Sequence, residues 1–169
     1  MAEKSMELLV NGNFASGDLQ GWVSDDPTRF KVVSYAPGKH CVVALGARRV
    51  GLSQFVFSPP GKLFLSFWHR ATDEQGNPVD KVTVSAGLLA YQTSQGSIVA
   101  PLIFQSTKEW QKWTSEYTIR KGEPPTRIQL EFQNADESLR QAVRSNFSLA
   151  DIEETPIALR DISLWNMEG

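Results

Sequence analysis

The sequence predicts an all-β fold, an antiparallel β-sandwich, and three observations support this prediction. About ten short β-patterned runs follow one another and are separated by turns rich in glycine, proline and asparagine. Several runs alternate apolar and polar residues with a period of two, which is typical of strands with one buried face. The length of 169 residues suits one well-buried core but is short for two full domains, so we expect a single domain over residues 1–169.

The expected strands lie between clusters of turn-forming residues. In chain order they cover residues 7–10, 29–35, 40–45, 50–57, 62–70, 81–91, 98–104, 113–119, 126–133 and 157–165. Proline and glycine gather in the gaps, at residues 37–38, 58–61, 75–78, 94–96 and 122–125. Glycine tolerates positive φ and proline presets φ near the value that tight turns need, so these segments are suited to reverse the chain.

The alternation also predicts where some strands lie in their sheets. The strand at 62–70 carries aromatic rings on both faces, so we expect it to lie centrally and to be covered on both sides. In the strand at 126–133, Ile128, Leu130 and Phe132 share the inward face, and the polar residues between them face water. Pro101 cannot donate a ladder hydrogen bond, which places the strand at 98–104 at a sheet edge or a bulge.

Residues 134–156 depart from the β pattern. Asp136 is suited to cap a short helix within 138–144. A connection of this length in a compact domain is commonly functional or mobile.

Both ends of the chain carry a distinctive pattern. Residues 9–22 read LVNGNFASGDLQGW, and residues 158–164 read ALRDISL. Residues 54–57 (QFVF), 60–68 (PGKLFLSFW) and 110–114 (WQKWT) follow in a consistent order between them. These segments resemble the non-catalytic carbohydrate-binding modules with a galactose-binding-like jelly-roll fold. The resemblance covers nearly the whole chain and implies a jelly-roll sandwich that recognises a glycan or polysaccharide.

The resemblance further implies a structural calcium ion between the opening motif and the last strand. Asp161 stands at the matching acidic position and Asn13 at the polar one, so these two are the candidate metal ligands. Calcium takes about six to eight oxygen ligands, and Ala15 stands where the resemblance would place a glutamate. We therefore expect a weakened site, the alternative being that Asp161 pairs with a backbone donor or an arginine.

Sugar recognition needs aromatic rings for the apolar faces of pyranoses and planar polar groups for their hydroxyls. The candidate ligand contacts are Trp68, Arg70, Tyr91, Gln92, Trp110 and Asn134. A site on a concave sheet face would use Trp68, whereas a site at the end loops would bring Tyr91 and Trp110 together. We favour the concave face, because a strand holds an aromatic platform more rigidly than a loop does.

Trp22 is expected to be buried and Trp165 to face solvent. The resemblance places Trp22 in the core. Trp165 follows Leu164 on the last strand, so it faces outward if Leu164 faces inward.

Several other functions find little support in the sequence. A formal net charge of −2, from 17 basic and 19 acidic residues, argues against a nucleic-acid partner. No segment approaches the roughly 18 to 20 apolar residues of a membrane span, and residues 1–7 lack the apolar core of a Sec leader. The histidines, His40 and His69, lack ligands at metal-site spacing, and no catalytic motif is present. We therefore expect no enzymatic activity.

Cys41, the single cysteine, lies in an apolar run and is expected to be buried and inert. The alternative to glycan binding is a protein-interaction or structural β-sandwich, for example in a phage particle or a bacterial surface assembly.

Overall fold

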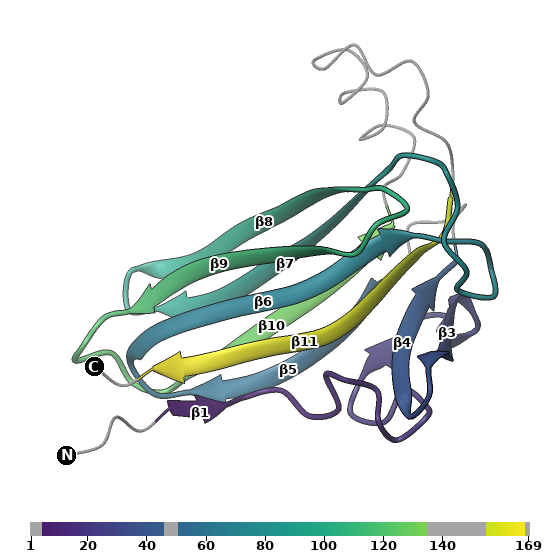
Figure 1. Cartoon of the computed structure of the whole chain (residues 1–169). Helices are drawn as coiled ribbons and strands as arrows, with labels where there is room; N and C mark the ends of the chain where they lie inside the picture. Colours follow the sequence, from purple (N-terminus) through teal and green to yellow (C-terminus); the bar gives the residue numbers. More distant parts are fainter. Residues whose placement is uncertain (1–4, 46–50, 135–154, 168–169) are drawn as a thin grey trace, which may run out of the picture.

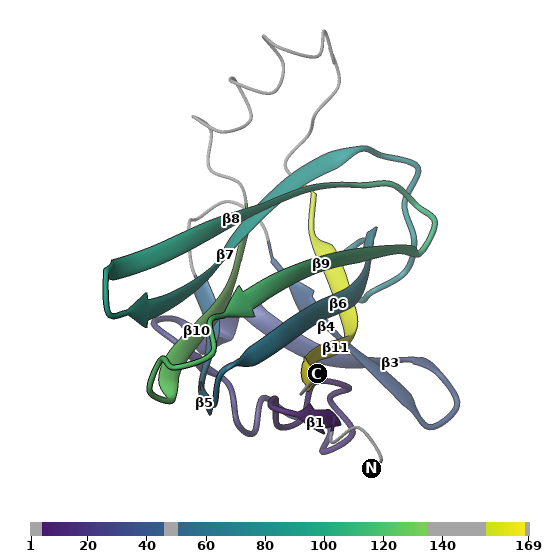
Figure 2. The ribbon, with the colours of Figure 1, turned by 90° about the vertical axis from the view of Figure 1, so that its left-hand side faces the viewer.

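The computed structural model describes residues 5–45, 51–134 and 155–167, and these form two antiparallel sheets packed face to face (Figures 1 and 2). Sheet A contains β3 (Phe30–Ala36), β4 (Lys39–Ala44), β11 (Ile157–Met167), β6 (Gly61–Ala71) and β9 (Gln111–Ile119) in that order, with β1 (Ser5–Glu7) pairing β11. Sheet B contains β2 (Val23–Ser24), β5 (Gly51–Ser58), β10 (Thr126–Asn134), β7 (Thr83–Thr93) and β8 (Gly96–Ser106). The predicted antiparallel β-sandwich is confirmed.

Each of the ten expected strands overlaps an observed one. The sequence missed β2, whose two residues are too few to show a period, and the short 3-10 helix η1 (Pro27–Arg29), which Asp26 caps by accepting from the Thr28 N–H. The helix expected within 138–144 lies outside the described residues. Among the described residues, no helix is long and apolar enough to cross a membrane.

The first strand ends at Glu7, earlier than expected. At Val10 the backbone hydrogen-bonds to the Gln54 side chain in place of a strand partner. The Val10 N–H donates to Gln54 Oε1 at 2.7 Å, and Gln54 Nε2 donates to the Val10 carbonyl oxygen at 2.9 Å. Gln54 therefore faces inward on β5 and is only 4% exposed. This inversion turns Phe55 and Phe57 of the same strand toward solvent.

The sandwich core is built around Phe67 on β6. Its ring centroid lies 4.9 Å from that of Phe132, 5.1 Å from that of Phe104 and 5.3 Å from that of Trp113. Phe132 and Phe104 come from sheet B and Trp113 from sheet A, so these contacts join the two layers. β6 pairs with β11 and β9 on its two sides, which confirms its central position. β8 ends sheet B, so Pro101 lies in an edge strand as predicted.

The opening motif closes one edge of the sandwich against β11. Trp22 is buried, stacks on Phe14 at 5.8 Å and donates its indole N–H to the Asn11 carbonyl oxygen at 3.0 Å, so its core position is confirmed. Gly12 lies so close to β11 that a Cβ there would overlap the Ile162 carbonyl oxygen, which requires glycine. The expected proximity of the two ends is confirmed, since β1 pairs with β11 (Figure 1).

Candidate functional site

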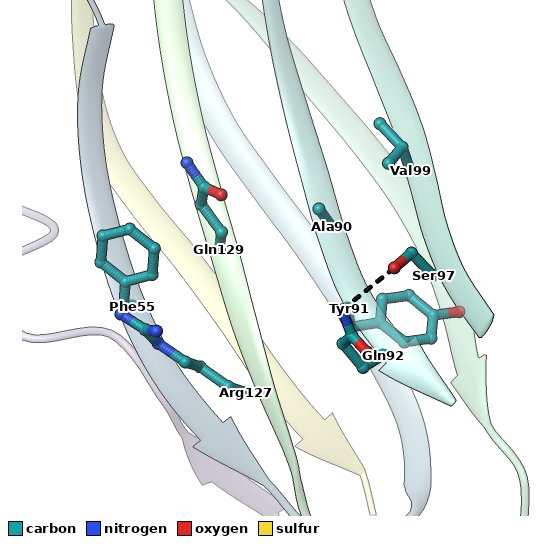
Figure 3. A pocket seen from close by; sticks show the side chains of 8 residues that line it. All are labelled: Phe55, Ala90, Tyr91, Gln92, Ser97, Val99, Arg127 and Gln129. Atoms are coloured by element: carbon teal, nitrogen blue, oxygen red, sulfur yellow. Dashed lines mark hydrogen bonds between the residues drawn. The ribbon is translucent and has the colours of Figure 1, made fainter. Parts of the chain in front are cut away.

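The outer face of sheet B carries a hollow of about 270 Å³ (Figure 3). Residues of β5, β7, β8 and β10 line it: Phe55, Ala90, Tyr91, Gln92, Ser97, Val99, Arg127 and Gln129. Four neighbouring strands therefore contribute, and the lining combines an aromatic ring, two carboxamides and a guanidinium group.

A stacked pair forms one wall of this hollow. The guanidinium carbon of Arg127 lies 4.2 Å from the centroid of the Phe55 ring, and Figure 3 shows the two side chains together on neighbouring strands. Phe55 remains 43% exposed despite this contact. At this distance the guanidinium group makes a cation–π contact with the ring.

Gln92 forms the opposite wall and is fixed by its own hydrogen bonds. Its Nε2 donates to Ser97 Oγ at 3.0 Å, the dashed line in Figure 3. The backbone carbonyl oxygen of Gln92 accepts from the Thr126 hydroxyl at 2.7 Å, and the backbone N–H of Gln92 donates to the Thr126 hydroxyl oxygen at 3.3 Å. Gln92 thus offers an oriented amide whose oxygen remains available to a hydroxyl donor.

A second hollow, of about 240 Å³, adjoins the first and shares Phe55 and Gln129 with it. Its lining includes Asp25 and Glu131, so it is richer in carboxylates. We call these two adjoining hollows together the polar groove of sheet B; Arg127 lines only the first hollow, and Asp25 and Glu131 line only the second.

The outer face of sheet A holds a different cluster, which contains three of the predicted contact residues. Arg160 lies over three rings, with its guanidinium carbon 4.7 Å from the centroid of Trp68, 4.6 Å from that of Trp110 and 5.3 Å from that of Tyr35. Arg70 also lies over Trp110, at 4.3 Å. The ring faces in this cluster are therefore largely engaged by the protein's own guanidinium groups.

The structure separates the six predicted contact residues. Trp68, Arg70 and Trp110 meet on sheet A, and all three are half-buried. Gln92 is exposed on sheet B. Tyr91 is among the lining residues of the first hollow but is only 6% exposed, and its hydroxyl donates to the Thr118 carbonyl oxygen, so little of its ring is open to a ligand. The backbone of Asn134 pairs with Ser85 at the end of β10, but its side chain lies outside the described part of the chain.

Phe55, Arg127 and Gln129 were not anticipated as contact residues. The alternation along 126–133 did place Gln129 on the outer face, and the same period places Arg127 beside it. Phe55 was missed because the apolar residues of Gln-Phe-Val-Phe are the ones usually buried. Its exposure depends on the inward position of Gln54, which binds the backbone of Val10, 44 residues away.

The two candidate metal ligands lie in adjacent segments, since the Ile162 N–H donates to the Gly12 carbonyl oxygen at 2.9 Å. The Asn13 amide oxygen accepts from the Ala15 N–H, and the Asp161 carboxylate lies 2.6 Å from Arg160 Nη1. The described residues contain no group of three or more acidic, histidine or cysteine side chains that could hold a metal. These donors do not fit calcium, which needs more oxygen ligands and would compete with Arg160.

The calcium ion that the resemblance implies is untested, and melting measurements decide whether it binds. We expect neither excess calcium nor a chelator to change the melting temperature. A bound ion would instead stabilise the fold by about 2.7 kcal/mol at roughly a hundredfold excess over Kd. A rise of several degrees with calcium, reversed by chelator, would restore the calcium hypothesis.

Cys41 is fully buried, and burial raises the pKa of its thiol to about 11. The thiol stays protonated near neutral pH and is a poor nucleophile. The structure thus agrees with the inert role expected for it.

Comparison with solved structures places this fold among carbohydrate-binding modules. A family 61 carbohydrate-binding module in complex with β-1,4-galactotriose superposes with a TM-score of 0.62 at 18% identity, covering 95% of this chain and 99% of the other. A family 16 module gives 0.63 at 19% identity, covering 93% and 98%. A xylan-binding domain of Paenibacillus barcinonensis gives 0.59 at 12% identity, covering 100% and 99%. The chain has the jelly-roll fold of these modules.

The sequence comparisons add no family assignment. No family model matches the chain, and no curated protein matches it.

Proposed function

We propose that this protein is a non-catalytic carbohydrate-binding module whose glycan lies along the polar groove on the outer face of sheet B. The observation that carries this proposal is the exposure of Phe55 on β5, beside the carboxamide of Gln129 and across the hollow from that of Gln92. An aromatic ring turned to solvent while a glutamine is buried on the same strand runs against core packing, and such reversals are expected at functional sites.

The chemistry of the groove suits a sugar chain. Pyranose rings present apolar C–H faces to an aromatic side chain, and their hydroxyls need both donors and acceptors. The groove supplies amide donors and acceptors at Gln92 and Gln129, and carboxylate acceptors at Asp25 and Glu131. The fold likeness to modules whose names state a glycan or xylan ligand supports the same ligand class.

We predict that Phe55→Ala weakens glycan binding by about 1–3 kcal/mol, or roughly 5- to 150-fold, because an aromatic contact with a ring is removed. Affinity electrophoresis against a panel of plant and bacterial polysaccharides, followed by calorimetry on any that bind, measures this loss. Phe57→Ala is the matched control, since Phe57 lies two residues along the same face and lines neither hollow. It should change affinity by less than about threefold, within the range of a neutral surface substitution.

The competing surface is tested in the same assay. Trp68→Ala changes the sheet A cluster, where Trp68 is half-buried whereas Phe55 on sheet B is 43% exposed, and should leave affinity near that of the wild type. Loss of binding in Trp68→Ala with full binding in Phe55→Ala would move the site to sheet A. Failure of the wild-type protein to retain any polysaccharide would contradict the glycan-binding proposal.

The second candidate function is a protein-binding sandwich, which one observation favours. Val99 and Ile103 on β8 are 61% and 54% exposed on the same outer face as Phe57, which is 69% exposed. Exposed apolar side chains of this kind can serve a protein partner. A blank polysaccharide panel would shift the assignment to this function.

A further inference from the structure

We propose that the groove on sheet B selects glycans that contain uronic acid units, and that Arg127 binds the carboxylate of such a unit. The inference rests on the proposed glycan-binding function and specifies the ligand class of the same groove.

Within the described part of the chain, Arg127 contacts an aromatic ring and no acidic side chain. Its guanidinium group lies on the Phe55 ring at 4.2 Å, and its cross-strand partner on β5 is Phe57. Gln92 of β7, which lines the same hollow, has a neutral amide side chain bonded to Ser97. Among the described residues, Arg127 makes no ion pair and no side-chain hydrogen bond, so its N–H groups are free to bind a ligand.

The arginines of sheet A differ from Arg127 in this respect. Arg160 is paired with the Asp161 carboxylate, and Arg70 donates to the Gly76 carbonyl oxygen at 3.1 Å. Both guanidinium groups are also stacked on tryptophan rings. These two are hydrogen-bonded or ion-paired within the fold, whereas the contact that the described residues make with the Arg127 guanidinium is the one with the Phe55 ring.

The chemistry of a stacked guanidinium group points to a carboxylate. A guanidinium group held over a ring by a cation–π contact presents a planar fork of N–H donors, which matches the two oxygens of a carboxylate. Among the described lining of the larger hollow, Arg127 is the single charged side chain. An anionic sugar would therefore meet one cation there and no opposing carboxylate.

The adjoining hollow makes the two ends of the groove different in charge. Glu131 lies four residues along β10 from Arg127, which corresponds to about 13 Å along a strand. Its carboxylate and that of Asp25 would repel an anion but accept hydrogen bonds from neutral sugar hydroxyls. A uronic acid would thus sit at the Arg127 end, with a neutral unit of the same chain at the other end.

Matched polysaccharides test this proposal directly. Glucuronoxylan, polygalacturonate and alginate would each be compared with its own carboxyl-reduced form by affinity electrophoresis at low and high salt. We expect at least one acidic polymer to be retained about tenfold more strongly than its reduced form, since a hydrogen-bonded ion pair is lost on reduction. Added salt should narrow this difference because it screens an exposed charge.

Variants of the full chain assign the effect to a residue. Arg127→Gln should abolish the preference for the acidic form, and Arg127→Lys should keep part of it, because a lysine retains the charge without the planar fork. Arg120→Gln, an exposed arginine outside both hollows, is the matched control and should keep the preference. Melting curves of all variants verify that each is folded.

Four outcomes would overturn the proposal. Equal retention of acidic and reduced polymers would overturn the acidic selectivity while leaving glycan binding intact. A preference that survives in Arg127→Gln would overturn the role of Arg127. A strong preference for a sulfated polysaccharide with none for any uronate would overturn the carboxylate assignment, and binding to no polysaccharide at all would overturn the proposed function together with this inference.

Discussion

Replacing Phe67 by alanine will destabilise the protein by about 3–5 kcal/mol, which is a large part of the stability of a domain this size. Phe67 is fully buried, and its ring contacts those of Phe104, Phe132 and Trp113 from both sheets. Removing the ring loses the transfer free energy of the phenyl group and leaves a cavity that the two layers cannot close without moving apart. Urea unfolding followed by circular dichroism measures the loss.

Phe57→Ala is the matched control for this change. Phe57 is 69% exposed on the outer face of sheet B, so the same substitution should alter the unfolding free energy by less than about 0.5 kcal/mol. Equal losses in the two variants would mean that Phe67 is not the centre of the core.

The second large effect is a loss of stability in mild acid caused by His69. This side chain is 4% exposed between the sheets, with Nδ1 2.7 Å from Ser106 Oγ on β8. Burial lowers the pKa of the imidazole from 6.5 to about 4. The unfolded chain therefore binds a proton in this window that the folded chain does not, so unfolding is favoured as the pH falls. Above pH 6.5 the effect is absent, and it reaches about 3 kcal/mol once the pH has fallen to about 4.

The variant His69→Gln keeps a polar group at this position but cannot titrate. Its unfolding free energy should fall less than that of the wild type between pH 7 and pH 5, a range above the titration of most carboxyl groups. Ser106→Ala removes the hydrogen-bond partner but not the burial, so it should keep the wild-type pH dependence. Identical pH dependence in the wild type and His69→Gln would show that His69 is not the responsible group.

The sequence predicted the strands well because the signals for them are local. Alternation with a period of two and turn-forming residues both lie within each strand and its flanks, as in 126–133, where the inward residues Ile128, Leu130 and Phe132 are all buried as expected. β2 was missed because two residues cannot show a period. Its pairing depends on β5, which is distant in the sequence.

The site was harder to predict because it depends on contacts between distant segments. Trp68 was correctly placed on the face opposite Phe67, but Arg160, which covers its ring, comes from β11. Tyr91 follows the adjacent pair Leu88-Leu89, so alternation could not assign its face. Phe55 is exposed only because Gln54 turns inward to bind the backbone of Val10. A glutamine between apolar residues marks such a position, but its direction is decided by its partner.

A ¹H–¹⁵N NMR titration with an oligosaccharide derived from a polysaccharide that binds tests the groove on sheet B most directly. We predict that the side-chain amide signals of Gln92 and Gln129 and the Nε signal of Arg127 shift on binding, because these groups line the groove. The indole N–H signals of Trp68 and Trp110 should stay in place. Shifts of the indole signals with unmoved Gln92, Gln129 and Arg127 signals would contradict the account and place the ligand on sheet A.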